Sequence, residues 1–446
     1  MNYIVKNGII VNEGSLKKDD LYIVDGKIAD QIPAGTVEVV DATGCYVLPG
    51  VIDTHVHFRE PGLTDKADMA SESRAAISGG VTSVIDMPNT IPQTTTIETL
   101  ESKERIAAEH CVANYGFMLG VTEDNIQSLL QIDCKRYAAL KLFLGSSTGN
   151  MLVQDSDKLD ELFEHARKLI VVHCEDEGVI TANMAACKAQ FEGTSDESAS
   201  LHPKIRTTEA CYVSTYKAIE RARKYGTRLH IAHLSSAAEL DLLSNKDINQ
   251  KLITAEVTPN HLWFDDRDYA TLGNQIKCNP SIKSNDDRLA LWAALYDGLI
   301  DTIATDHAPH TWESKQRPYF AAPSGIPSIQ HSLLMMLEPF FNPSVDGGQQ
   351  SDLLQTWLPL IVTKMSHNPA DIFGIRNRGY LRNGYWADVV LVRQGVTNVT
   401  DASLQYKCGW SPLLGQSFHG EIVRVFVNGV PADAGHKSSM ALEFSR

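Results

Sequence analysis

The sequence predicts an α/β protein whose main part is a (β/α)8 barrel and whose two ends form a small β-sandwich domain. Apolar, strand-like runs alternate with longer helical stretches over the central part of the chain. Such alternation is typical of a parallel sheet, and the length of this part favours a barrel over an open sheet. Short β-like runs bounded by turn signals occupy both ends of the chain.

The N-terminal part of the small domain is predicted over residues 1–48. Its β-like runs are Tyr3–Val11 and Leu21–Val24, and the Asp25-Gly26 pair that follows is a hairpin signal. Residues 376–446 contain two similar β-like runs, Ala387–Val392 and Ile422–Gly429. We therefore expect the two chain ends to form one β-sandwich domain.

The barrel is predicted over residues 49–375, with a strand at each short apolar run. The clearest runs are Thr82–Met87, Ala139–Phe143, Leu169–His173, Leu229–His233 and Thr302–Asp306. Each run ends in, or leads into, a residue that can bind a metal or move a proton. Because catalytic residues of such barrels lie at the C-terminal ends of the strands, this recurrence predicts one shared site there.

Two histidines, His55 and His57, close an earlier apolar run that begins after the breaker pair Pro49-Gly50. Side chains alternate along a strand, so both histidines point to the same side and can hold one metal ion together. Taken alone, the pair fits two unrelated histidines near a strand end equally well. The polar residues that follow later strands favour the metal site.

Four of these later residues carry most of the signal. Lys141 lies within the apolar run Ala138–Gly145, where an isolated ammonium group would be costly to bury. His173, His233 and Asp306 each follow another such run. A lone buried histidine is more often a core residue with satisfied hydrogen bonds, but the full set, in barrel order, indicates a common site.

Composition excludes several classes of function. The 446 residues are 43% hydrophobic and 21% charged, which is typical of a globular protein. A net charge of -15, without any Lys/Arg run, argues against nucleic-acid binding. No apolar run approaches the roughly 18 residues of a membrane span, and the N-terminus lacks the apolar core of a signal peptide. The 8 scattered cysteines, with no Cys-x-x-Cys, predict reduced thiols in a cytoplasmic protein.

The chain resembles the amidohydrolase superfamily and, within it, the dihydroorotases. The superfamily features are Pro-Gly-x-Ile-Asp-x-His-x-His at residues 49–57 and Asp306. The narrower match rests on four motifs: His57–Gly62, Asp86–Thr90, Thr305–His310 and Cys408–Pro412. The resemblance covers residues 3–430 and implies a zinc-dependent hydrolase of a cyclic amide.

The resemblance also implies a centre of two zinc ions, bridged by a hydroxide and by a carbamate formed on Lys141. A protonated lysine has no lone pair to give, but burial and nearby metal charge favour the neutral amine that reacts with carbon dioxide. One ion would be held by His55, His57, Lys141 and Asp306, and the other by Lys141, His173 and His233. Imidazole and carboxylate are normal zinc donors, so Cys174 and Cys278 are left as packing residues.

The implied reaction is the reversible cyclisation of N-carbamoyl-L-aspartate to L-dihydroorotate plus water, a step of pyrimidine (UMP) biosynthesis. In the hydrolytic direction the bridging hydroxide would attack the ring carbonyl, and Asp306 would pass its proton to the leaving nitrogen. Arg59, Asn89 and His310 match the residues that bind the substrate carboxylate, for which a guanidinium fork is well suited. Asn279 is a further candidate for contact with the ring.

Two alternatives stay open at this stage. An allantoinase or dihydropyrimidinase would use the same metals, although a ring without the carboxylate would leave Arg59, Asn89 and His310 unpaired. A non-catalytic, dihydroorotase-like partner of aspartate transcarbamoylase would have lost metal ligands that this chain retains.

The resemblance implies a homo-oligomer, with a dimer favoured, and leaves association with aspartate transcarbamoylase undecided. Residues 311–323 fit a lid over the pocket or an ordinary surface loop.

Overall fold

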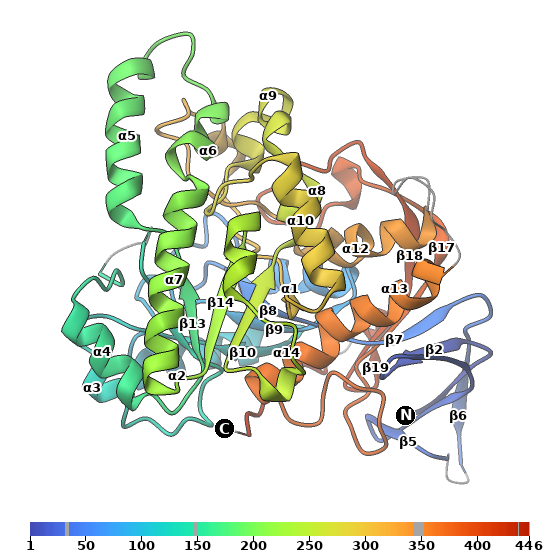
Figure 1. Ribbon diagram of the computed structural model, residues 1–446. Helices are drawn as coiled ribbons and strands as arrows, with labels where there is room; N and C mark the ends of the chain where they lie inside the picture. Colours follow the sequence, from blue (N-terminus) through green and yellow to red (C-terminus); the bar gives the residue numbers. More distant parts are fainter. Residues whose placement is uncertain (32–34, 146–149, 343–351, 436, 446) are drawn as a thin grey trace.

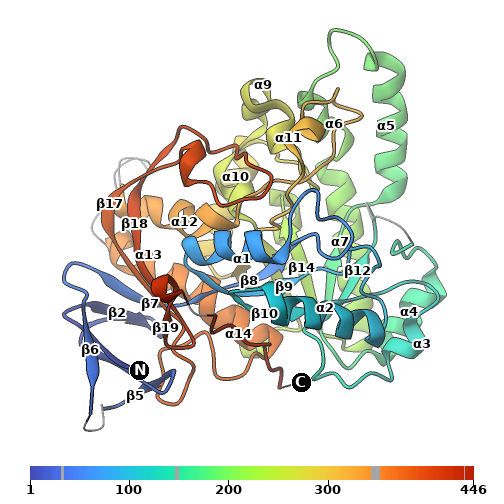
Figure 2. The ribbon, with the colours of Figure 1, turned by 180° about the vertical axis from the view of Figure 1, so that it is seen from behind.

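A computed structural model describes residues 1–31, 35–145, 150–342, 352–435 and 437–445. Parallel strands occupy its centre and helices cover them on both sides, with α7 and α10 in front in Figure 1 and α1 and α2 in front in Figure 2. The strands at the two chain ends lie together at one side of this body, and both termini lie on its lower face. Helix α5 stands away from the rest of the molecule.

The central strands form two parallel sheets, ordered β10-β9-β8 and β11-β12-β13-β14-β15-β16. Their bounds are β8 Val51–Val56, β9 Val81–Asp86, β10 Asn114–Phe117, β11 Leu119–Gly120, β12 Leu140–Phe143, β13 Ile170–His173, β14 Leu229–Leu234, β15 Ile253–Val257 and β16 Thr302–Ile303. A single parallel bridge between Val56 and His307 links the end of β8 to the segment after β16. Among the described residues the ladders do not close into one continuous ring.

Continuous burial explains why these strands could be predicted from apolar runs. Strands β9, β12, β13 and β14 are buried at every position. Parallel strands covered by helices on both faces have this pattern, whereas strands with one solvated face alternate apolar and polar residues. The predicted strands therefore lie where the runs indicated them. The last run contains a shorter strand than expected, because β16 comprises only Thr302–Ile303.

Helices follow most of the strands. The longer ones are α1 Met69–Ser78, α2 Ile97–His110, α4 Ser156–His165, α5 Glu177–Phe191, α7 Thr208–Tyr225, α10 Asn285–Tyr296, α12 Ser332–Phe341 and α13 Asp352–Val362. Shorter ones are α3 Ile126–Leu129, α6 His202–Ile205, α8 Pro259–Trp263, α9 Tyr269–Leu272, α11 Trp312–Lys315 and α14 Asn368–Phe373. Local signals set their ends. Helix α7 begins where the Thr207 side chain accepts a hydrogen bond from the Ala210 N–H, and it ends at Gly226, whose φ is 69°.

The two chain ends meet in one sheet, ordered β19-β18-β17-β7-β2-β3, beside a second sheet ordered β5-β4-β1-β6. The bounds are β1 Asn2–Lys6, β2 Ile9–Asn12, β3 Ser15–Lys18, β4 Leu21–Val24, β5 Lys27–Ala29, β6 Val37–Asp41, β7 Tyr46–Pro49, β17 Val389–Asn398, β18 Ser417–Val427 and β19 Val430–Pro431. Buried side chains of both sheets, among them Ile23, Val389 and Phe426, share one apolar cluster. This arrangement agrees with the expectation that the chain ends associate.

A single residue separates this sheet from the parallel strands. Gly50 lies between β7 and β8, and a Cβ atom at Gly50 would come 2.1 Å from the Thr82 Oγ1 atom. Only glycine fits such a close approach. The Pro49-Gly50 pair therefore marks the point where the chain passes from the terminal sheet into the strand that carries His55.

A buried polar network joins the terminal sheet to β10. The Asn114 amide lies 3.2 Å from both carboxylate oxygens of Asp388, which also forms an ion pair with Arg378. Asn428 donates its backbone N–H to Asp388 and its side-chain amide to Asn114, at 2.8 and 2.7 Å. Because the buried charges are compensated by each other and by hydrogen bonds, the network can fix the terminal sheet against the central body.

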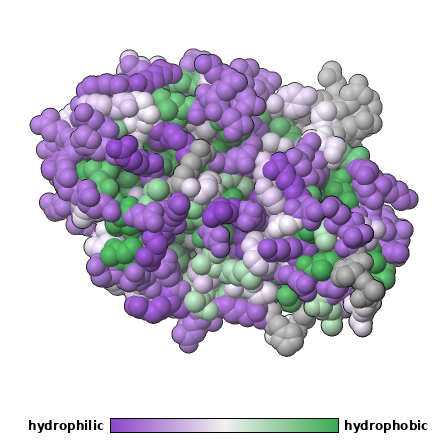
Figure 3. Space-filling model, turned by 90° about the horizontal axis from the view of Figure 1, so that it is seen from below, coloured by the Kyte–Doolittle hydropathy of each residue, from purple (hydrophilic) through white to green (hydrophobic). Residues whose placement is uncertain are grey.

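The lower face in Figure 3 carries mostly polar side chains, with apolar ones in small separate groups. Scattered apolar residues of this kind are normal on a folded protein surface. Within the described ranges, we find no helix with the length and apolar character needed to span a bilayer.

Candidate active site

A cavity of about 740 Å³ lies at the C-terminal ends of the parallel strands. Every residue predicted for the site lines this cavity: His55, His57, Arg59, Asn89, Lys141, His173, His233, Asn279, Asp306 and His310. The folded chain therefore brings together side chains that the sequence places far apart. Arg206, which was not predicted, lines the same cavity.

The strands determine where the potential metal ligands lie. His55 belongs to β8, Lys141 to β12, His173 ends β13, and His233 lies near the end of β14. Asp306 follows β16. His233 and Asp306 have positive φ angles of 39° and 48°, a conformation that few residues with a side chain adopt. Such conformations are concentrated at functional sites, and both residues are turned toward the cavity here.

Two histidines converge on Asp306. The Nε2 atoms of His57 and His55 lie 3.0 and 3.3 Å from its Oδ1 atom. The Nδ1–H of His55 donates to Glu256 at 2.8 Å, which leaves the Nε2 lone pair directed at the cavity. Potential ligand atoms of His55, His233 and Asp306 all lie within 4.8 Å of one another. These residues are a suitable donor set for zinc.

Charge within this group favours an ionised Asp306. Burial acts to raise the pKa of this carboxyl, but His55 and the hydrogen bond from His57 outweigh it and hold the pKa below its ordinary value. Burial lowers the pKa of His57 to about 4, so its imidazole is neutral near pH 7. A neutral imidazole and an ionised carboxylate are the forms that bind a metal ion.

A second pair of imidazoles adjoins this group, with the ring centroids of His233 and His55 5.3 Å apart. The Nδ1 atom of His173 and the Nε2 atom of His233 are 2.8 Å apart. His173 donates its Nε2–H to Glu175 at 2.9 Å, and Glu175 forms an ion pair with Arg206. The Nδ1 atom of His173 is therefore free of its proton and available to a cation. Glu175 orients His173 as Glu256 orients His55.

Lys141 lines the same cavity as both groups of histidines. Its side chain is 1% exposed, and its Nζ atom has no hydrogen-bond partner among the described residues. Burial lowers the pKa of Lys141 to about 8, although Glu256 and Asp306 act in the opposite direction. An orphaned, readily deprotonated amine is costly to bury unless it has another use, so this residue fits a metal-bridging carbamate.

Other residues of the cavity lining offer donors for an anion. The Arg59 Nε atom donates to the Pro309 carbonyl at 3.1 Å, and its Nη2 atom lies 3.2 Å from the Nε2 atom of His310. That His310 nitrogen also lies 3.0 Å from the Ser324 carbonyl. Because a carbonyl only accepts, the His310 N–H donates to Ser324 and provides no lone pair for Arg59. Arg59 thus retains N–H donors for a ligand.

Two further residues of the cavity lining carry side-chain amides. The Oδ1 atoms of Asn89 and Asn279 are buried and have no hydrogen-bond partner within the described part of the chain. Both residues line the cavity. Unsatisfied amide groups inside a cavity are expected to bind polar groups of a ligand.

Sequence reasoning missed Glu256, a residue of β15 that supports the site. Its Oε1 atom accepts hydrogen bonds from His55 and from the His233 backbone N–H, at 2.8 and 3.2 Å. Burial acts to raise the pKa of Glu256, but His55 and His230 outweigh it and keep the carboxylate ionised. One signal was available. An isolated acid within the buried run Ile253–Val257 needs a partner.

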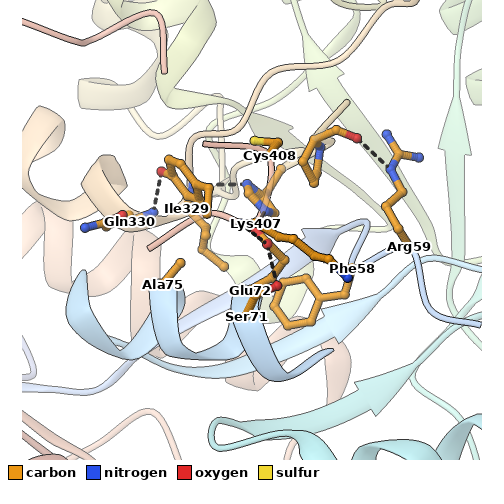
Figure 4. A network of polar contacts seen from close by, with 12 residues as sticks. Phe58, Arg59, Ser71, Glu72, Ala75, Ile329, Gln330, Lys407 and Cys408 are labelled. Atoms are coloured by element: carbon orange, nitrogen blue, oxygen red, sulfur yellow. Dashed lines mark hydrogen bonds and ion pairs between the residues drawn. The ribbon is translucent and has the colours of Figure 1, made fainter. Parts of the chain in front are cut away.

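A second buried network, also missed, holds the wall around Arg59 (Figure 4). Glu72 of α1 and His307 are both 0% exposed, and the His307 Nε2–H donates to Glu72 at 2.8 Å. The other Glu72 oxygen accepts from the Ser71 hydroxyl and the Lys407 N–H, at 2.8 and 3.0 Å. The network thereby joins α1, the segment after Asp306 and the start of the Cys408–Pro412 motif.

This motif reaches the site directly through Trp410. Its indole N–H donates to the His310 carbonyl at 2.7 Å. His307 is fixed from its other side as well, because its Nδ1 atom accepts from the Ser328 N–H at 3.1 Å. The C-terminal motif therefore supports the site although none of its residues is among those that line the cavity.

Residues 311–323 pack against the cavity wall. Lys315 is 1% exposed, and its ammonium group donates to the carbonyls of Lys277, Pro323 and Gly325 at 3.2, 3.1 and 2.9 Å. Pro323 and Gly325 line the cavity. The segment is thus anchored as part of the wall, and movement as a lid stays a prediction from the sequence.

Comparisons with known proteins agree with this geometry. Residues 46–431 match the model of the amidohydrolase family. A dihydroorotase of Methanosarcina mazei is 33% identical over 92% of this chain and 90% of its own length. An allantoinase of Salmonella paratyphi B is 27% identical over 96% of this chain and 94% of its own. The solved L-hydantoinase (dihydropyrimidinase) of Arthrobacter aurescens is 26% identical, has a TM-score of 0.88, and aligns over 99% of both chains.

Proposed function

Since the chain belongs to the amidohydrolase family, we propose that it is a dihydroorotase, a hydrolase that acts on a cyclic amide. It would interconvert N-carbamoyl-L-aspartate and L-dihydroorotate plus water. One observation carries this choice of substrate. Potential metal-binding side chains and the guanidinium group of Arg59 line the same cavity, so a ring amide and a free carboxylate can be bound at once.

The residues present fit two zinc ions. His55, His57 and Asp306 would hold one ion, His173 and His233 the other, and a carbamate on Lys141 would bridge them. Support comes from the converging donor atoms and from the orphaned amine of Lys141. When bound, two such ions polarise a carbonyl and lower the pKa of water.

Asp306 would move the proton. In hydrolysis it would accept a proton from the attacking water and deliver it to the ring nitrogen that leaves, and in cyclisation the steps would run in reverse. Its contacts with His55 and His57 support this role, because they keep the carboxylate ionised and fix its orientation.

Arg59, Asn89 and His310 would bind the free carboxylate, with Asn279 against the ring. Arg59 has donors that no described residue fully satisfies, and the Oδ1 atoms of Asn89 and Asn279 have no hydrogen-bond partner among the described residues. An allantoinase or a dihydropyrimidinase remains the alternative, but a substrate without a carboxylate would leave Arg59 unused.

Some wider features belong to this proposal as well. We infer a closed (β/α)8 barrel over residues 49–375 and a β-sandwich domain from residues 1–48 and 376–446. The single bridge from Val56 to His307 and the apolar cluster shared by the terminal sheets support these inferences. A cytoplasmic location and a homodimer are expected as before, and association with aspartate transcarbamoylase stays open.

The decisive experiment compares three substrates. Zinc-loaded protein is assayed for hydrolysis of L-dihydroorotate, allantoin and dihydrouracil in parallel, with and without a chelator. We expect turnover of dihydroorotate alone and its loss on chelation. Turnover of a competitor instead would overturn the substrate assignment. Absence of all three activities with zinc bound would favour the non-catalytic partner.

A further inference from the structure

The loop after Arg59 folds back toward that residue. The Arg59 carbonyl accepts from the Leu63 N–H at 3.0 Å, and the Leu63 carbonyl accepts from the Lys66 N–H at 3.1 Å. Gly62, with a φ of 83°, allows the tight path, because a Cβ atom there would lie 2.0 Å from the Ile91 carbonyl oxygen. These two turns bring Lys66 to the same cavity wall as Arg59.

The resulting wall has an excess of positive charge. Arg59 and Lys66 both line the cavity, and neither forms an ion pair with a carboxylate among the described residues. The polar neighbours of the Arg59 side chain are the Pro309 carbonyl, which accepts its hydrogen bond, and the His310 imidazole, both uncharged. The neighbouring Asp65 is exposed and does not pair with Lys66. An incoming anion would meet two cations that form no direct ion pair with a carboxylate of the described residues.

The charges of these groups act on one another. Burial and then the charge of Arg59 lower the pKa of Lys66, while Asp65 acts in the opposite direction. Burial, Arg59, Lys315 and Lys66 lower the pKa of His310, opposed by its hydrogen bond to Ser324. Bringing like charges together in a cavity is unfavourable unless a ligand of opposite charge relieves it.

We propose that Lys66 is a further substrate-binding residue, which binds the free carboxylate of the substrate together with Arg59 and selects anionic substrates over neutral rings. A carboxylate has two oxygens and about four lone-pair positions, and the fork of one guanidinium uses only part of them. The ammonium group of Lys66 supplies donors for the rest. This inference rests on the proposed function and extends it to substrate selection.

The test combines kinetics with binding. Zinc-loaded wild type, Lys66→Met and Lys66→Arg are compared for dihydroorotate hydrolysis and for the Kd of orotate, a flat ring that carries the carboxylate, with uracil as the ring without it. We expect Lys66→Met to raise the KM and the Kd of orotate about tenfold, as loss of one hydrogen bond to a charged group implies. The kcat should change less than about twofold, because Lys66 does not touch the reacting carbonyl.

Controls separate charge from folding. Lys66→Arg should keep most of the affinity, and Lys246→Met, which removes an exposed lysine elsewhere, should match wild type. Unchanged KM and Kd values in Lys66→Met, or an equal loss of affinity for uracil, would overturn the role of Lys66. If wild type binds orotate but does not hydrolyse dihydroorotate, the proposed function fails, and the orotate affinities alone then decide the role of Lys66.

Discussion

Asp306 combines a strained backbone with a carboxylate that is held ionised. Its φ of 48° orients the side chain toward His55 of β8 and His57, which follows the end of β8. The strain is tolerated because neighbouring contacts over-determine the conformation. We predict that Asp306→Asn loses turnover about 10³-fold, since removal of a general base typically costs 10² to 10⁴. The kcat and the zinc content are measured on the same sample. Near-normal activity in a variant that retains its zinc would contradict a role in proton transfer.

His331 provides a pH-dependent prediction outside the cavity. It is 2% exposed, and burial lowers its pKa from 6.5 to about 4. The unfolded chain therefore binds more protons than the folded one between these values, so stability is lost as the pH falls from about 6.5 to 4. The full loss would be about 3 kcal/mol. His331→Phe should reduce this acid sensitivity.

The measurement for His331 is urea unfolding of metal-free protein at pH 7 and pH 5. Metal-free samples are needed because acid also releases zinc from its ligands. His110→Phe is the matched control, since His110 is exposed on α2. An unchanged difference in stability between the two pH values in His331→Phe would refute the prediction.

At the scale of elements, Glu72 connects α1 to two segments that are distant in sequence. Its carboxylate accepts from three donors, and an amide at this position would place an N–H group against another N–H group. We predict that Glu72→Gln lowers the free energy of unfolding by about 1–3 kcal/mol, the cost of an unsatisfied buried group. It should also raise the KM for dihydroorotate, because the Arg59 wall loses support.

Urea unfolding and steady-state kinetics test this prediction, with the exposed Glu109→Gln as the control. A loss of stability without a change in KM would show that the network supports the fold alone. Unchanged stability would mean that the buried carboxylate has no net effect.

The elements differ in how well the sequence predicted them. Buried parallel strands are continuous apolar runs, so β12, β13 and β14 and the site residues at their ends could be identified directly. Glu256 could not be assigned, because one acid in an apolar strand has no periodic signature. The contact of Glu72 with His307 joins residues 235 positions apart, and no local pattern specifies such a contact.

For the whole molecule, metal binding and stability should be linked. A ligand that binds only the folded chain stabilises it, by about 4 kcal/mol at a thousand times its Kd. We therefore predict that a chelator abolishes activity and lowers the Tm, and that zinc with bicarbonate restores both. Thermal melting with parallel activity assays tests this. Full activity or an unchanged Tm after complete removal of zinc would contradict the metal-dependent site.

The terminal sheet can be completed only late in translation, because its strands come from both ends of the chain. Strand β7 leads directly into β8, yet its antiparallel partner β17 is synthesised only after the whole central body. During translation, the edge of β7 that pairs with β17 therefore stays unpaired until the ribosome has made the intervening strands and helices. Exposed strand edges promote association between chains. A nascent chain of this protein is accordingly expected to need protection by a chaperone until its last strands emerge.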